Sequence, residues 1–126
     1  MKNRSLALLM MGLLLSFALQ AGEAPKKVKT FTLEDYNGVK HSLADYKSSK
    51  AIVLMFIATQ CPVSNAYNGR MVELQKDYSS KGVTFVGINA NKQEGIDETK
   101  NHAKEHGFDF PVLKDWNNVI ADQLGA

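Results

Sequence analysis

Cysteine is nearly absent from this sequence: Cys61 is the only one in 126 residues. One cysteine cannot form an internal disulfide, so Cys61 is either an inert buried thiol or a reactive one. The net charge is only +2, and the lack of a basic run argues against nucleic acid as a partner. The three histidines, His41, His102 and His106, have no metal-ligand spacing with a cysteine or carboxylate, so we expect neither a metal nor a cofactor. His102 and His106 are expected to be solvated residues on one helix face.

The longest apolar run, residues 6–19, is shorter than the roughly 20 residues that a membrane-spanning helix needs. Two basic residues precede this run, and the small residues Ala21, Gly22 and Ala24 follow it. Basic, apolar and small segments in this order are typical of a secretory signal peptide. We therefore expect residues 1–24 to be removed, after Ala21 or Ala24, and the protein to be exported, to the periplasm, without stable membrane association. A retained membrane anchor is the alternative.

The remaining residues, 25–126, are expected to form one domain of ordinary size. Two short alternating stretches surround Asn37-Gly38, a dipeptide that favours the tight turn of a β-hairpin. Residues 51–57 and 83–88 are continuous apolar runs of strand length, which indicates strands that are covered on both faces. Residues 89–95 follow the second of these strands and are expected to be a plain connecting loop, with a loop that lines the site as the alternative.

Helical periodicity separates the two apolar strands. Apolar residues recur every three or four positions from Val63 to Tyr78, which predicts one amphipathic helix that ends near Gly82. A more polar helix is expected over residues 97–106, followed by a short strand over 110–113 and another helix over 118–124. Strands that alternate with helices in this order predict an α/β fold with a parallel sheet between layers of helices.

Cys61 lies where the first buried strand meets the first amphipathic helix, and Thr59, Gln60 and Pro62 complete the expected active-site loop. Pro62 suits the first turn of a helix, where its missing N–H would have no partner anyway. Cys61 is therefore expected at a helix N-terminus, where free amides and the helix dipole favour the nucleophilic thiolate. Ser64 stands three residues on and is expected to cap the helix or to donate a hydrogen bond to the thiolate.

Several stretches resemble the redoxin domains of the alkyl hydroperoxide reductase and thiol-specific antioxidant family, in the thioredoxin-like superfamily. They are F-x-L-x-D-x-N-G-x-x-x-S-L-x-D-Y at 31–46, I-V-L-M-F-I-A-T-Q-C-P-V-S-N at 52–65, V-T-F-V-G-I-N at 83–89 and F-D-F-P-V-L-K-D at 108–115. The resemblance implies a thioredoxin-like fold, with a central mixed sheet flanked by helices. It also implies thiol-based redox activity, with Cys61 in the place of the nucleophile.

The sequence departs from the family pattern in three ways. Ser64 replaces the resolving cysteine of a C-x-x-C pair, so Cys61 cannot close an internal disulfide. The peroxiredoxin motif P-x-x-x-[T/S]-x-x-C is missing, because Leu54 and Ala58 occupy its proline and threonine positions. The family's cis-proline hairpin and last helix would follow residue 126, since Pro111 comes too early to be that proline. We therefore expect residues 25–126 to be a C-terminally truncated redoxin domain.

Three functional hypotheses remain open from the sequence. In the first, Cys61 attacks a protein disulfide, and an external thiol reductant resolves the mixed disulfide. In the second, Cys61 reduces a peroxide and becomes a sulfenic acid, which is again resolved from outside. In the third, the domain is a non-catalytic binding module in which Cys61 is vestigial and the groove beside it holds a partner peptide.

Overall fold

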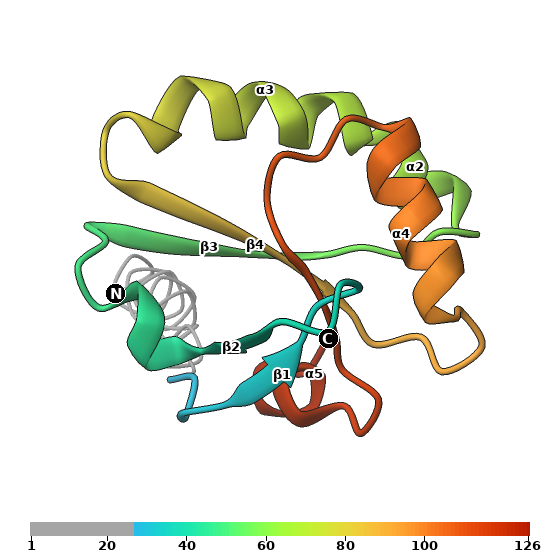
Figure 1. Ribbon diagram of the computed structural model, residues 1–126, viewed down its shortest axis with the longest axis horizontal. Coiled ribbons are helices and arrows are strands. Elements are labelled where there is room, and N and C mark those ends of the chain that lie inside the picture. The colour runs from blue at the N-terminus through green and yellow to red at the C-terminus, as the bar shows by residue number, and fades with distance from the viewer. Residues whose placement is uncertain (1–26) are drawn as a thin grey trace, which may run out of the picture.

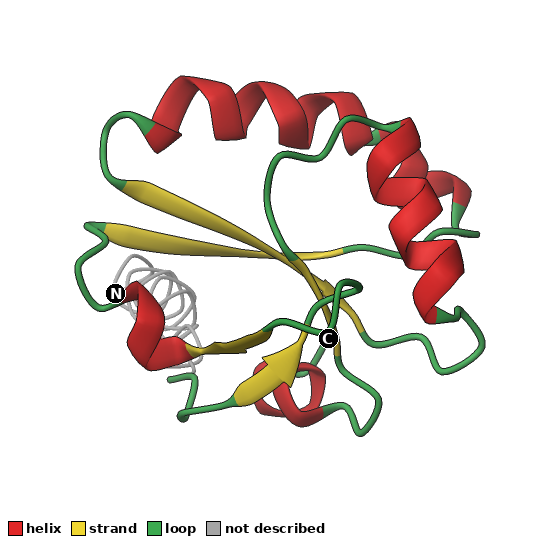
Figure 2. Cartoon of the chain, viewed as in Figure 1, coloured by secondary structure: helices red, strands yellow, loops and turns green. Residues whose placement is uncertain are grey.

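Three parallel strands form the centre of the computed structural model, which describes residues 27–126 (Figures 1 and 2). They are β3 (Ala51–Phe56), β4 (Val83–Asn89) and β5 (Val112–Lys114), hydrogen-bonded in the order β3-β4-β5. The first two strands confirm the strands expected from the apolar runs. Because all three strands run the same way, their carboxyl ends lie at one edge of the sheet.

A β-hairpin precedes the parallel sheet, as the Asn37-Gly38 turn predicts. Its strands are β1 (Thr32–Glu34) and β2 (Lys40–Ser42), which pair antiparallel. Gly38 has a φ of +78°, and the Asp35 carboxylate accepts hydrogen bonds from the backbone amides on both sides of the glycine. An antiparallel bridge from Asp35 to Leu113 joins the hairpin to β5, so parallel and antiparallel pairing both occur.

Helices and the hairpin cover the two faces of the sheet. Helices α3 (Asn68–Ser79) and α4 (Ile96–Glu105) lie on one face, and the hairpin, the 3-10 turn η2 (Leu43–Tyr46) and α5 (Val119–Leu124) lie on the other (Figure 1). Alternate strand residues supply two separate cores. The buried members of the first are Met55, Ile57, Phe85, Ala103, Phe108, Phe110 and Val112, and those of the second are Phe31, Val86, Ile88, Leu113 and Ile120.

The single helix expected over residues 63–78 is wrong, because the chain forms two helices there. Helix α2 (Pro62–Ala66) ends at Tyr67, and α3 begins at Asn68. The Tyr67 amide donates to the carbonyl of Ser64, three residues back, so the last turn of α2 is tightened. The side chain of Asn68 is buried and bonds to His102 on α4, and this contact ties the start of α3 to the neighbouring helix.

The solvated position expected for His102 is also wrong. Its side chain is only 8% exposed, its Nε2 lies 3.2 Å from Asn68 Nδ2, and its ring packs edge-on against Phe108. The buried face of α4 carries Thr99, His102 and Ala103. His106, one turn later, is exposed as expected.

One expectation concerns the first residues of the chain. The expected signal peptide, residues 1–24, lies outside the described residues. Over residues 27–126, no helix combines the length and apolar character that crossing a membrane requires.

Candidate functional site

Cys61 lies just beyond the carboxyl end of β3, where it is the N-cap residue of α2. Its backbone is extended, with φ −85° and ψ 116°, and its carbonyl accepts the first helical hydrogen bond, from Asn65 N at 3.0 Å. Pro62 occupies the first helical turn, as expected. The thiol is free and exposed. The alternative of a buried cysteine is therefore wrong, and the reactivity of Cys61 as a nucleophile stays a prediction.

Ser64 lies inside α2 and does not cap it, because Cys61 takes the N-cap position. Its hydroxyl oxygen accepts a hydrogen bond from the backbone amide of Ala58, at 3.0 Å. This bond connects the first turn of α2 to the end of the strand segment that leads to Cys61. The hydroxyl proton stays free for a second partner, since a serine hydroxyl both donates and accepts.

Two backbone amides of the loop before Cys61 donate hydrogen bonds to one carboxylate. Glu94, which follows β4, accepts the amide of Thr59 at 2.9 Å and the amide of Gln60 at 3.1 Å, one on each carboxylate oxygen. Asn65 donates from its side chain to the carbonyl of Thr59, at 2.9 Å. Every backbone polar group in these contacts belongs to the two residues that immediately precede the cysteine.

The side chains of the same two loop residues bond to a second carboxylate. Glu98 on α4 accepts hydrogen bonds from the Thr59 hydroxyl and from Gln60 Nε2, the latter at 2.9 Å. These two bonds lower the pKa of Glu98 below its ordinary value. The structure thus places Thr59, Gln60 and Pro62 around Cys61, as expected for an active-site loop.

Glu94 itself is fully buried and belongs to a polar network at the carboxyl edge of the sheet. Its carboxylate also accepts hydrogen bonds from the side chains of Asn89 and Asn91. Burial raises the pKa of Glu94, but the hydrogen bonds from Thr59, Asn89 and Gln60 outweigh burial and leave the pKa below its ordinary value. Glu94 is therefore held as a carboxylate, which can accept all four N–H groups at once.

Lys114, the last residue of β5, completes this network. Its ammonium group donates to the Asn89 side-chain oxygen, to the carbonyl of Asn91 and to the carbonyl of Glu94. Burial lowers the pKa of Lys114, while the charges of Glu94 and Glu98 act in the opposite direction. The ends of all three parallel strands are thus joined by side chains that lead to the Cys61 loop.

The sequence analysis gave no role to Glu94, Asn89 or Lys114. A plain loop was preferred for residues 89–95 over one that lines the site, and Lys114 was expected to follow a short strand. The available signal was the position of Asn89, Asn91 and Glu94 directly after a buried parallel strand. Residues at the carboxyl ends of such strands lie where open α/β sheets place their functional sites.

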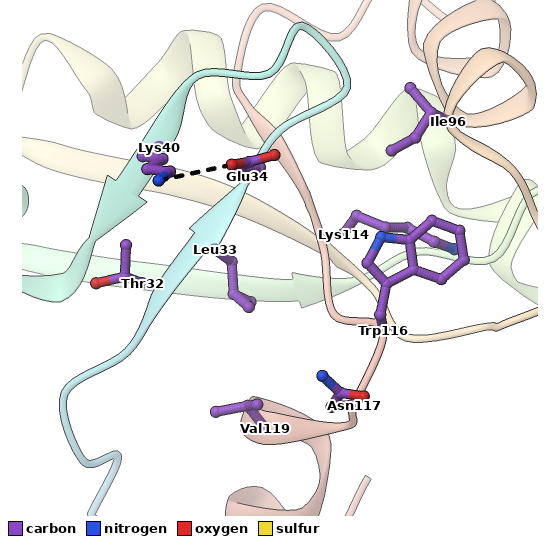
Figure 3. Close-up of a pocket in the computed structure, with 9 residues that line it drawn as sticks. All are labelled: Thr32, Leu33, Glu34, Lys40, Ile96, Lys114, Trp116, Asn117 and Val119. Atoms are coloured by element: carbon purple, nitrogen blue, oxygen red, sulfur yellow. Dashed lines mark ion pairs between the residues drawn. The ribbon is translucent and has the colours of Figure 1, made fainter.

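Two cavities lie near this edge of the sheet, and one of them adjoins the Cys61 loop. It has a volume of about 180 Å³ and is lined by Phe56, Ile57, Ala58, Ser64, Ile88, Ala90 and Asn91. The other, of about 310 Å³, lies between the hairpin and the segment after β5, with Trp116 stacked over the Lys114 ammonium group (Figure 3). The lining of this second cavity includes none of the loop residues next to Cys61.

Exposed apolar side chains follow Cys61 in the chain. Val63 in α2 and Tyr67, the residue at which α2 ends, are 69% and 59% exposed, and Pro62 is exposed as well. Over residues 27–126, no three histidine, cysteine, aspartate or glutamate side chains gather as ligands for a metal ion. The site thus presents one exposed thiol on a loop whose backbone is hydrogen-bonded to the side chains of Glu94 and Asn65.

Comparison with known proteins finds a family model and relatives that match most of the chain. The model of the AhpC/TSA family matches residues 24–126. The thiol-disulfide oxidoreductase ResA of Bacillus subtilis is 32% identical over 92 residues, which cover 73% of this chain and 50% of ResA. The chain therefore spans about half the length of that relative.

Solved structures show the same similarity at the level of the fold. A thiol:disulfide interchange protein of the thioredoxin family from Chlorobium tepidum superposes with a TM-score of 0.66 at 32% identity, over 79% of this chain and 67% of that one. The peroxidoxin BcpB from Mycobacterium tuberculosis superposes with a TM-score of 0.69 at 25% identity, over 80% of this chain and 65% of BcpB. The expected thioredoxin-like fold is confirmed.

Proposed function

Because the chain belongs to the AhpC/TSA family, we propose that it is a thiol-based oxidoreductase whose nucleophile is Cys61. The observation that carries the proposal is the exposed, free thiol at the N-cap of α2, directly after a parallel strand. The thiolate is the attacking form in disulfide exchange, and an exposed thiol is open to a substrate. The relatives named for disulfide exchange and for peroxide chemistry both support a reaction at sulfur.

The reaction is disulfide exchange with a second thiol from outside. The Cys61 thiolate attacks one sulfur of a substrate disulfide, forms a mixed disulfide and releases the other sulfur as a thiolate, which takes up a proton. Since Ser64 carries no thiol, an external thiolate attacks the mixed disulfide and regenerates Cys61. A further external thiol then releases the remaining substrate sulfur, so that two external thiols are oxidised to one disulfide for each substrate disulfide reduced.

The substrate class is a protein disulfide. The exposed side chains of Val63 and Tyr67, which follow the thiol in the chain, offer apolar surface to a polypeptide segment. The chain's reaction takes place outside the cytoplasm in this proposal, with residues 1–24 acting as a signal peptide. The mass of the exported protein tests that part, and a start between Gly22 and Pro25 is the expected result.

Trapping the mixed disulfide tests the function. The reduced chain is mixed with a peptide disulfide, quenched with acid and weighed by mass spectrometry, with Cys61→Ser as the control. We expect an adduct of one peptide thiol on the wild type, which added glutathione removes, and no adduct on Cys61→Ser. Absence of an adduct on the folded wild type, when the urea-unfolded chain forms one, contradicts the proposal.

The same preparation separates the two alternatives. Treatment with hydrogen peroxide followed by dimedone, which captures sulfenic acids, reports the peroxide reaction. A dimedone adduct formed faster than the peptide adduct would favour peroxide reduction. A thiol that reacts with neither reagent in the folded chain would favour the binding module.

A further inference from the structure

Glu94 is a buried carboxylate at a position in the chain where a surface residue would be expected. It lies in a loop between β4 and α4, yet it is fully buried, and a buried carboxylate is costly unless hydrogen bonds compensate for the lost water. Four N–H groups make that compensation, and two of them are the backbone amides of Thr59 and Gln60. The carboxylate therefore restrains the backbone of the two residues that precede Cys61.

We propose that Glu94 is a positioning residue, which fixes the backbone of Thr59 and Gln60 so that the Cys61 thiol faces a macromolecular disulfide in one orientation. The effect on disulfide exchange rests on the proposed function. The hydrogen bonds between Glu94 and the loop backbone do not depend on that function. Disulfide exchange requires the attacking sulfur to approach along the S–S axis, and misplacement of a reacting atom by about 1 Å can cost on the order of 100-fold in rate. A loop whose amides were free would sample several directions of the thiol.

The network behind Glu94 keeps the carboxylate in place. Lys114 donates to the carbonyl of Glu94 and to the side-chain oxygen of Asn89, whose amide group in turn donates to the Glu94 carboxylate. Asn89 also donates to the carbonyl of Ile57 at 3.0 Å, at the start of the same loop. The position of the thiol is thus set from the ends of β4 and β5, and not by the loop's own residues alone.

Hydrogen exchange at single amides reports directly on the hydrogen bonds between Glu94 and the loop backbone. In the wild type, we expect the amides of Thr59 and Gln60 to be protected, although they lie in a loop and bond to no backbone carbonyl in the structure. In Glu94→Gln, one carboxylate oxygen becomes an NH₂ group that faces N–H donors, so exchange at these two amides should accelerate by about 10- to 100-fold. Glu98→Gln is the matched comparison, because Glu98 bonds to the same residues through their side chains, and it should change these rates by less than about threefold.

A pair of reaction rates tests the consequence for Cys61. In Glu94→Gln, the exchange rate with a folded protein disulfide should fall by about tenfold or more, whereas alkylation by iodoacetamide, a small reagent with little orientational demand, should stay within about twofold. A merely structural role would lower both rates together or neither. Glu105→Gln, which removes an exposed charge from α4, should leave both rates unchanged.

The outcomes are distinguishable from those of the proposed function. Unprotected Thr59 and Gln60 amides in the wild type overturn the positioning role, and this measurement decides even if Glu94→Gln fails to fold. Unchanged amide exchange in a folded Glu94→Gln, or equal losses of both reaction rates, also overturns it. If the amides behave as expected and the wild type attacks no disulfide, the fastening stands and the proposed function fails.

Discussion

Gly87 in β4 has no room for a side chain, so alanine at this position should destabilise the fold by about 1–3 kcal/mol. A Cβ atom here would lie 2.8 Å from Ile57 Cδ1 and 3.0 Å from Val112 Cγ2. These two side chains are 3% and 1% exposed, so neither can move away without disturbing the core. The backbone cannot retreat either, because Gly87 pairs with Met55 in β3 and with Val112 in β5.

Urea unfolding measures this loss. For an unfolding slope of about 1.5 kcal/mol per molar urea, the midpoint of Gly87→Ala should fall by about 0.7–2 M with no change of slope. Gly69→Ala is the matched control, since Gly69 lies in α3 with no atom within 4 Å of the added Cβ. Alanine there should leave the midpoint unchanged or raise it, by up to about 1 kcal/mol of stability. An unchanged midpoint for Gly87→Ala, or equal losses at both glycines, would refute the close approach of the strands.

Three further changes test other parts of the structure. Asp115→Ala should cost about 2 kcal/mol in urea unfolding, because the buried carboxylate accepts the amides of residues 119–121 at the start of α5. Burial, and then the charge of His106, lower the pKa of His102 in the folded chain. The unfolded chain therefore binds the proton more tightly than the folded chain. The stability that is present above about pH 6.5 is lost as the pH falls through the lower folded pKa. Between pH 7.5 and 5.5 the urea midpoint should fall more for the wild type than for His102→Gln. Ser64→Cys should form an internal disulfide with Cys61 under mild oxidation, and intermolecular dimers alone, seen by mass spectrometry, would contradict the geometry.

Local sequence patterns were sufficient for the hairpin, the two long strands and the position of Cys61. The Asn37-Gly38 turn depends on residues within a few positions of one another, and the run of residues 51–57 reports burial on both faces of a strand. Pro62 marks the start of a helix for a reason that concerns only its own missing N–H. In each case the physical cause lies inside the segment that shows the pattern.

The features that sequence reasoning missed depend on partners far away in the chain. Thr59 and Glu94 are 35 residues apart, and Asn68 and His102 are 34 apart. Nothing near His102 in the sequence distinguishes a buried imidazole with an amide partner from a solvated one. The break between α2 and α3 is similar, since the apolar spacing from Val63 to Tyr78 continues across it, while the tightened turn appears only in the backbone hydrogen bonds.

Ser64 shows how the absence of a second cysteine fits the rest of the site. Its hydroxyl oxygen accepts the amide of Ala58, a bond that a thiol makes poorly because sulfur is a weak acceptor. A cysteine at this position would allow the chain to resolve its own mixed disulfide, but it would weaken the connection between α2 and the end of the strand segment. With serine, all three backbone amides before Cys61 have side-chain partners: Ala58 donates to Ser64, and the next two amides donate to Glu94. The proposed exchange with an external thiol is compatible with these hydrogen bonds, because it needs no thiol at position 64.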